Sequence, residues 1–321
     1  DAMGFFQDLS AGDQGILSFE EGQRWYDGLQ KGGQDAVDAT LDLIATFSQG
    51  KIPQEMLADY SPGSKKYASV WDHVVDTAER YNDPGRFTAL IGFEWTSLVK
   101  GNNLHRNVIF RDGANRVSRV VPYTTQSPFG STDPLDLYTY LDNYEKATGG
   151  SVLALAHNGN LSNGLMFPVD AQYTGRKLDS EYVTKRAKWE PLYEVSQIKG
   201  DGEAHSLLSP EDEFADYETW DAGNLDLSAA KTDDMLSQEY AREALKNGLA
   251  LEAKLGTNPY KFGMVGSTDS HTALATAQED TFFGKHTGTE PSADRIKHPF
   301  TKTEHGEFKG WEAVASGLAA V

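Results

Sequence analysis

Five side chains with the chemistry of metal ligands stand at the ends of short apolar segments. Glu94, His157 and Asp269 each come where such a segment finishes. His271 follows two residues after Asp269, and His105 lies just before another apolar segment. Imidazole and carboxylate groups are the ligands expected for zinc, manganese or iron. The chain contains no cysteine, so the predicted site uses nitrogen and oxygen ligands only.

The apolar segments have the length and the β-branched and aromatic content of buried strands. Stretches with helical spacing separate several of them, and this alternation predicts a largely parallel sheet whose strand ends share one edge. His105 precedes its strand, so it reaches that edge only if its strand and the Glu94 strand form an antiparallel hairpin. The predicted strands are 87–95, 107–110, 151–156, 192–198 and 262–267, and the predicted helices are 35–48, 69–81, 134–147 and 233–255.

The chain divides into a helical N-terminal part and a larger α/β part. Residues 1–66 are predicted to be a peripheral helical segment, and residues 67–321 are predicted to form the domain that carries the site. Two polar, turn-rich insertions, 158–188 and 203–232, are expected to be long loops over one face.

Some histidines and carboxylates are better candidates than others. Glu94 lies between Phe93 and Trp95, where a buried carboxylate is costly unless positive charges or a metal compensate it. In extended backbone, Asp269 and His271 would point the same way, so one short segment would supply two ligands. Four histidines outside this set are expected to be exposed: His73 on an amphipathic helix, and His286, His298 and His305 in a basic, turn-rich segment.

Four further residues are candidates for binding an anionic substrate. Arg106 adjoins His105, and Arg111 ends the same predicted strand. Lys199 ends the 192–198 strand, and Asn158 follows His157. Arginine suits bidentate phosphate contacts and lysine acts as a point charge. Alternatively, Arg111 and Lys199 balance an acidic surface, and Asn158 is an ordinary turn residue.

The composition excludes several classes of function. The formal charge of −19 argues against a nucleic-acid-binding surface, although a few cations in one pocket still allow a small phosphorylated substrate. No apolar run is long enough to span a bilayer. No G-x-S-x-G elbow, Walker A loop or G-x-G-x-x-G fingerprint occurs, so no sequence motif supports a serine hydrolase, a P-loop or a dinucleotide-binding function.

Four segments resemble the signatures of a bacterial family of unknown function in the PHP (polymerase and histidinol phosphatase) superfamily. The resemblance extends from about Trp71 to Val321 and includes 197–201 (QIKGD). The segment after the Glu94 strand is the most specific of the four. The segments are 91–95 (IGFEW), 103–112 (NLHRNVIFRD), 155–158 (LAHN) and 267–271 (STDSH).

The resemblance implies a distorted (β/α)7 TIM-like barrel with two or three divalent metal ions, which are zinc, manganese or iron. Glu94 would then be a bridging carboxylate, with the three histidines and Asp269 named above as further ligands. The superfamily's N-terminal H-x-H strand and T-D-H segment do not occur in this sequence. We therefore expect the chain to be an internal portion of a longer polypeptide, incomplete at both ends, and its activity alone stays open.

The function expected is phosphoester hydrolysis by a metal-activated hydroxide. Glu94, Asp269 and Arg106 would be catalytic, and Arg106 and Lys199 would hold the phosphate. The rival functions are metal-dependent hydrolysis of an amide or a sulfate ester, and a non-catalytic binding module with a degenerate metal site. Relatives of this family are often exported, so a periplasmic location is expected. The sequence leaves metal identity, natural substrate and oligomeric state open.

Overall fold

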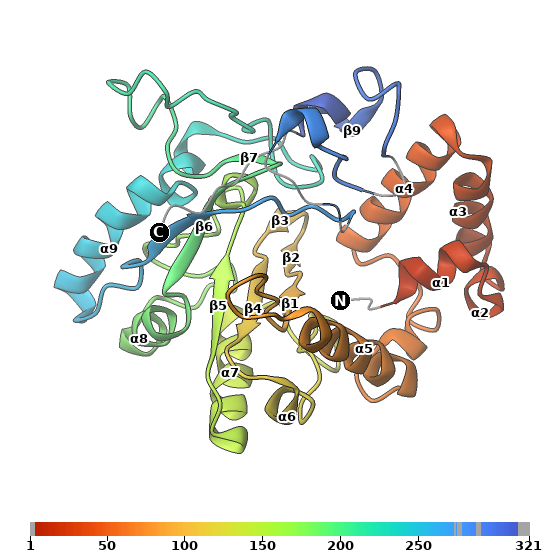
Figure 1. Cartoon of the computed structure of the whole chain (residues 1–321). Helices are drawn as coiled ribbons and strands as arrows, with labels where there is room; N and C mark the ends of the chain where they lie inside the picture. Colours follow the sequence, from red (N-terminus) through yellow and green to blue (C-terminus); the bar gives the residue numbers. More distant parts are fainter. Residues whose placement is uncertain (1–3, 273, 275–277, 287–289, 314–321) are drawn as a thin grey trace.

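The computed structural model describes residues 4–272, 274, 278–286 and 290–313. At its centre lies a six-stranded mixed sheet (Figure 1). Its strands are β1 (Gly92–Trp95), β4 (Arg106–Phe110), β5 (Val152–Ala156), β6 (Leu192–Gln197), β7 (Gly200–Asp201) and β8 (Gly263–Gly266). The strand order is β1-β4-β5-β6-β7, and β8 pairs with the other side of β6.

The sheet has an antiparallel half and a parallel half. β1, β4 and β5 are successively antiparallel, whereas β5, β6 and β8 are parallel. The antiparallel hairpin that His105 needs in order to reach the common edge of the strand ends is present, since Trp95 lies opposite Arg106. Arg106 in turn lies opposite Ala156. The end of β1, the start of β4 and the end of β5 therefore meet at one edge of the sheet, and β6 and β8 extend beyond this edge in the same direction as β5.

All five predicted strands are present, and the first is much shorter than expected. The prediction of a strand from residue 87 is wrong, because β1 begins at Gly92. Residues 83 and 87 form a small bridge of their own around a tight turn. Phe87 and Leu90 are 61% and 60% exposed, so their apolar side chains are not part of the buried sheet.

The prediction of a distorted (β/α)7 TIM-like barrel is wrong. In the described part of the chain the sheet is open: β1 pairs only with β4, and β8 pairs only with β6. Barrel closure requires every strand to have two neighbours around the ring. The prediction of a largely parallel sheet is also wrong, because β1, β4 and β5 run antiparallel to one another.

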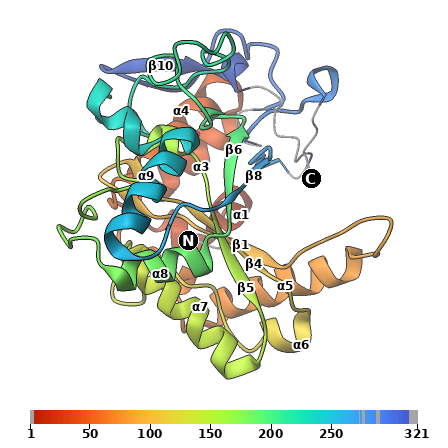
Figure 2. The ribbon, with the colours of Figure 1, turned by 90° about the vertical axis from the view of Figure 1, so that its left-hand side faces the viewer.

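One face of the sheet packs on helices and forms the main apolar core. Arg106, Val108 and Phe110 of β4 are buried, whereas Asn107 and Ile109, which alternate with them, are only half-buried, as the alternation of a strand requires. Helices α7 and α8 lie beside β5 in both views (Figures 1 and 2). The helices of this core are α5 (Lys65–Tyr81), α7 (Pro134–Thr148), α8 (Ser180–Trp189) and α9 (Ala241–Leu255).

Capping residues define where these helices begin and end. Ser64 caps α5, Asp133 caps α7 and Asp179 caps α8, each by accepting a backbone N–H in the first turn. Gly256 ends α9 in a left-handed conformation, as predicted. The expectation that 158–188 is all loop is wrong, because Asp179 starts α8 inside it. The predicted 233–255 helix is interrupted between η3 (Asp233–Gln238) and α9.

The N-terminal helices have a small apolar core of their own. As predicted, the segment is helical; α1 to α4 group together in red and orange at the right of Figure 1. Phe5, Leu9 and Trp25 are among the side chains buried there. The helices are α1 (Phe5–Ala11), α2 (Gln14–Leu17), α3 (Glu20–Lys31) and α4 (Gly33–Ser48), followed by the 3₁₀ turn η1 (Ala58–Tyr60).

In the described residues, no helix has the length and apolar character needed to cross a membrane.

The remaining elements are short. A hairpin of β9 and β10 packs near Trp220, whose ring stacks on Phe308 at 4.1 Å between centroids. These elements are β2 (Leu98–Val99), β3 (Asn102–Asn103), α6 (Ala114–Val117), η2 (Gly159–Leu161), η4 (Glu279–Thr281), β9 (Pro299–Thr303), β10 (Gly306–Lys309) and η5 (Gly310–Glu312).

Candidate metal centre

The hairpin of β1 and β4 brings Glu94 and His105 together on the face of the sheet opposite the main core. Glu94 lies directly across from Asn107, so their side chains share one face. His105 is two residues before Asn107, and it joins that face because side chains alternate along a strand. His157 directly follows the last residue of β5. Buried Asn103 holds this turn by donating from Nδ2 to the carbonyl oxygens of His157 at 2.7 Å and Asn158 at 3.1 Å.

Glu94, His105 and His157 form a compact group of potential ligands. Nδ1 of His105 and Nε2 of His157 each lie 3.0 Å from Oε1 of Glu94. The two imidazole rings are edge to face, with centroids 5.5 Å apart. One potential ligand atom from each of the three residues lies within 4.8 Å of the other two. With small side-chain movements, the three ligand atoms could therefore bind one transition metal ion.

Two imidazole nitrogens in this group lack hydrogen-bond partners. Nε2 of His105 is buried and makes no hydrogen bond in the described structure. Nε2 of His157 lies near Glu94 but without an aligned hydrogen bond. Buried polar atoms in folded proteins nearly always have a partner, and a metal ion is one partner that satisfies them. The donor set and its unsatisfied nitrogens therefore fit a divalent cation.

The charges in the group are balanced by one another. Burial raises the pKa of Glu94, but the imidazoles of His105 and His157 lower it more, so that pKa lies well below its usual range. Burial lowers the pKa of His105. Burial also lowers the pKa of His157, but three carboxylates raise it more, and its net shift is upward. Those carboxylates are Glu94, Glu194 and Asp269.

Asn107 contacts the second nitrogen of His157. Its Nδ2 lies 3.1 Å from Nδ1 of that imidazole. If the carboxamide turns to present its oxygen, that oxygen accepts a hydrogen bond from Nδ1–H and leaves the lone pair of Nε2 free to bind a metal. A partner on the far nitrogen commonly fixes the ring of a metal-bound histidine in this way. Asn107 was not among the predicted site residues. It lies directly across the hairpin from Glu94, and this pairing follows only from the strand register, which the sequence does not give.

Asp269 and His271 belong to a second group, built around two lysines at the end of β8. Nζ of Lys199 and Nζ of Lys285 both contact Oδ2 of Asp269, the second at 2.7 Å. Nζ of Lys285 also lies 2.7 Å from Nδ1 of His271. Asp269 adopts a left-handed conformation with φ of 53°. Such a backbone is uncommon outside glycine and often marks a functional position.

The structure therefore joins three of the five predicted ligands within 4.8 Å, and the other two form a pair that interacts electrostatically with this group. Asp269 is still close enough to the first group to raise the pKa of His157. The expectation that Asp269 and His271 sit on extended backbone is wrong, since Asp269 is left-handed. The two side chains nevertheless stay near each other, with 3.8 Å between Oδ1 of Asp269 and Nδ1 of His271.

The predicted roles of Arg106 and Arg111 in catalysis and substrate binding are contradicted by where their side chains lie. Arg106 is fully buried on the opposite face of β4 from His105, and its Nε donates to Glu190 at 2.9 Å. Strand alternation explains this, because neighbouring residues point to opposite faces. Arg111 is exposed just beyond the far end of β4, away from the edge that carries His105.

Lys199 and Asn158 do lie at the edge that carries the site. Only 6% of the Lys199 side chain is exposed, and its Nζ forms an ion pair with Oδ2 of Asp269. Asn158 is 2% exposed and left-handed, with φ of 49°. Its Nδ2 donates to Asn160 at 3.3 Å, and its Oδ1 has no partner in the described structure. Asn158 is therefore placed to donate or accept beside His157.

Sequence reasoning missed other charged residues at this edge. Glu194 of β6 is 3% exposed, accepts from the Ser267 hydroxyl, and has a pKa that burial raises. A carboxylate in the middle of an apolar parallel strand was a usable signal for it. Nothing in the sequence around Lys285 marked it as a site residue, because it takes part only through its contact with Asp269 in the turn after β8.

Expectations for the remaining histidines are confirmed in part. His73 and His305 are exposed, as predicted. His298 is 5% exposed, so its predicted exposure is wrong. His286 is half-buried and packs on His271, with 5.1 Å between ring centroids. Its predicted exposure was also wrong, because its segment returns to pair with the turn after β8.

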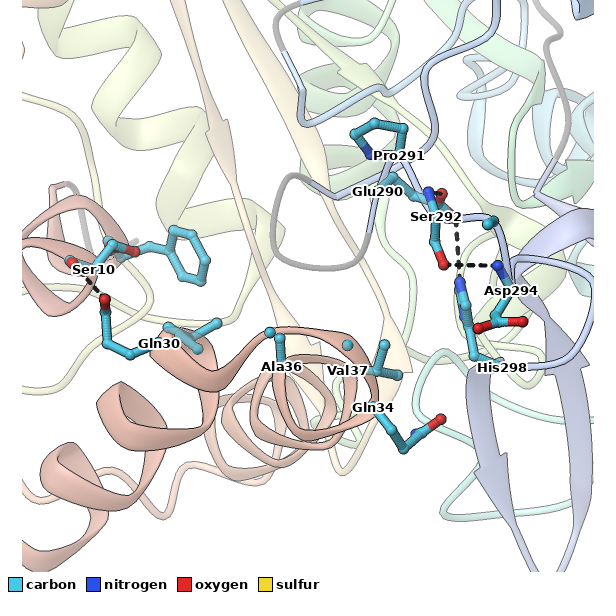
Figure 3. Close-up of a pocket in the computed structure, with 15 residues that line it drawn as sticks. Ser10, Gln30, Gln34, Ala36, Val37, Glu290, Pro291, Ser292, Asp294 and His298 are labelled. Carbon is cyan, nitrogen blue, oxygen red and sulfur yellow. Dashed lines mark hydrogen bonds and ion pairs between the residues drawn. The ribbon is translucent and has the colours of Figure 1, made fainter.

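A cavity of about 600 Å³ lies elsewhere, between the N-terminal helices and the segment from Glu290 to His298 (Figure 3). Glu290 and His298 face it from one side, and Gln30 and Gln34 from the other. None of the three residues of the metal-ligand group lines this cavity. We place the candidate site at the ligand group because three potential ligand atoms lie within 4.8 Å of one another there.

Comparison with known proteins identifies one family. The chain matches, over residues 1–321, the family described as "Protein of unknown function (DUF3604)". No curated protein and no solved structure matches the chain.

Proposed function

The chain belongs to this family, and we propose that it is a metal-dependent hydrolase, with phosphoesters as its substrates. The metal would be bound by Glu94, His105 and His157. A relationship to the PHP superfamily is part of the proposal and rests on the sequence motifs around these residues. The observation that carries the proposal is the closeness of three ligand atoms, within 4.8 Å of one another, at a strand edge of an α/β fold.

The donor set favours a borderline transition metal. Two imidazoles and one carboxylate are a common three-residue set for catalytic zinc, and they also suit manganese or iron. A divalent ion bound there would lower the pKa of water and neutralise charge that develops on the substrate. Three protein ligands leave coordination positions open for water and substrate.

The chain's own residues would orient the reactants. About a quarter of the Glu94 side chain is exposed, at 26%, whereas the two imidazoles are almost fully buried. Substrate would therefore approach from the Glu94 side. Asn158, beside His157, would accept a hydrogen bond from a substrate hydroxyl or from water through Oδ1, which has no partner in the described structure. Lys199 would hold the Asp269 carboxylate in place, and its positive charge favours an anionic substrate.

Activity assays with metal-loaded protein test the proposal. The substrates are an aryl phosphate, an aryl phosphodiester, an aryl sulfate and an aryl amide, each with and without added zinc or manganese. We expect metal-dependent turnover of a phosphate ester that Glu94→Gln abolishes. Turnover of only the sulfate or the amide would move the function to that bond. Stoichiometric metal binding without turnover would favour a binding module, and the absence of metal binding would overturn the proposal.

A further inference from the structure

The ammonium group of Lys285 occupies a position with the geometry of a bound cation. It contacts three acceptors: the carbonyl oxygen of Asp269, Oδ2 of the same residue at 2.7 Å, and Nδ1 of His271 at 2.7 Å. Only 4% of the Lys285 side chain is exposed. Two oxygens and one imidazole nitrogen are also a plausible ligand set for a divalent metal.

The hydrogen-bonding capacity of the group is used up by these contacts. A lysine ammonium has three N–H donors and no acceptor, and all three donors have a partner here. Donation from Lys285 to His271 requires the tautomer in which Nδ1 accepts, and the same Nδ1 also lies 2.9 Å from the carbonyl oxygen of Asp269. Lys285 therefore has no donor left for a substrate.

The backbone around this position is shaped for the contact. The amide of His271 donates to the carbonyl of Lys285 at 2.8 Å, so the two segments are joined by a backbone hydrogen bond. The left-handed conformation of Asp269 turns its carbonyl oxygen and its carboxylate toward the same ammonium. The lysine is thus held from both its backbone and its side chain.

We propose that Lys285 supplies a built-in cation at the Asp269–His271 position, so that this pair binds a lysine where a second metal ion would otherwise bind. The proposal rests on the proposed function only in taking the Glu94 group as the first metal position. The chain then binds one divalent ion at Glu94, His105 and His157. Removing the ammonium frees the carbonyl oxygen of Asp269 and Nδ1 of His271 for a second ion, with Oδ1 of Asp269 nearby, while Lys199 stays paired with Oδ2.

Counting bound metal ions in matched variants tests this proposal. The whole chain, Lys285→Met and Lys285→Gln are titrated with zinc and with manganese by calorimetry at pH 7, and bound metal is counted after dialysis. Lys261→Met is the matched control, because Lys261 is exposed. We expect one ion per chain for the wild type and the control, and two for the Lys285 variants. Adding Asp269→Asn to Lys285→Met should return the count to one.

Each outcome separates this proposal from the proposed function. Two ions in the wild type, or no additional ion in a folded Lys285 variant, would overturn the lysine proposal. Circular dichroism checks folding, and Lys285→Gln keeps a polar side chain of similar length in case the methionine variant does not fold. No ion in the wild type and one in Lys285→Met, lost with Asp269→Asn, would support the lysine proposal and overturn the metal site at Glu94.

Discussion

Two carboxylates, the partly exposed Glu94 and the buried Glu190, lie on opposite sides of the β1–β4 hairpin and differ in how they are satisfied. Their positively charged or protonatable partners include His105 and Arg106, which are adjacent in the chain. Because strand alternation sends these neighbours to opposite faces, one joins the candidate metal group and the other joins a cluster under the helices.

The Glu190 cluster is complete in itself. Glu190 accepts from Arg106 at 2.9 Å and from the Tyr138 hydroxyl at 2.5 Å, and it pairs with Arg186 at 3.1 Å. Arg106 also donates to the carbonyl of Leu104 at 2.6 Å. Burial raises the pKa of Glu190, but the two guanidinium groups lower it more, so the carboxylate stays charged. A buried charge with this many partners is a structural element.

The Glu94 group is incomplete without a further partner. It has two imidazoles around one carboxylate oxygen, and Nε2 of His105 has no partner in the described structure. Burial of a charged group therefore does not by itself distinguish a functional site from a structural one. Unsatisfied ligand atoms distinguish the two.

The largest expected effect is the loss of stability when the Glu190 cluster is broken. Arg106→Met should lower the free energy of unfolding by about 3–5 kcal/mol, because it leaves Glu190 buried with less compensation. Chemical denaturation of the wild type and the variant measures this difference in the free energy of unfolding. Arg111→Met is the control, with an expected change below about 0.5 kcal/mol because Arg111 is exposed. Equal effects of the two substitutions would contradict the contrast between the two faces of β4.

Removing the carboxylate of the metal group should weaken metal binding and spare the fold. Glu94→Gln keeps the size of the side chain but removes the charged ligand. We expect zinc affinity to fall by more than about 100-fold, beyond the range for partners that only orient a ligand. The loss of stability without metal should be smaller than for Arg106→Met. Calorimetric titration and denaturation measure the two quantities, and unchanged affinity would place the metal elsewhere.

Removing the partner of the His157 ring should have a smaller effect on metal binding. Asn107→Ala takes away the group 3.1 Å from Nδ1 of His157. We expect a loss of affinity of about 10–100-fold, as for other groups that orient a histidine ligand. Zinc titration of this variant alongside Glu94→Gln measures the ranking. A loss larger than that of Glu94→Gln would reverse the assigned roles.

The difference in stability between the wild type and Arg106→Met should narrow in acid. The pKa of Glu190 is lowered in the folded wild type, so its stabilisation is present above the unfolded pKa of about 4.3 and is lost as pH falls through the folded pKa. In the variant the folded pKa is less depressed, so less stabilisation remains to be lost. Denaturation at pH 7, 5, 4 and 3 measures the difference, and a constant difference would show that Glu190 ionisation is not responsible.

The sequence was sufficient for the local parts of this arrangement. Short apolar segments located the strands, and polar residues at their ends located Glu94, His105 and His157, because strand ends of a sheet share an edge. The pairing of strands that are distant in the sequence could not be predicted in this way. Whether the sheet closes depends on contacts between distant strands, and the predicted barrel proved wrong for that reason.

Side-chain direction was the other failure. Arg106 was assigned to the site because it adjoins His105, although alternation along β4 sends it to the opposite face. Lys285 was missed because it reaches Asp269 from a segment sixteen residues away. Neither the register of a hairpin nor the return of a loop can be read from local spacing.

Anomalous X-ray diffraction from crystals grown with zinc tests the central claim most directly. We predict a strong zinc peak bounded by Glu94, His105 and His157, with both histidines contributing a nitrogen at about 2.0–2.1 Å. Crystals containing zinc but no peak among these three side chains would contradict the account.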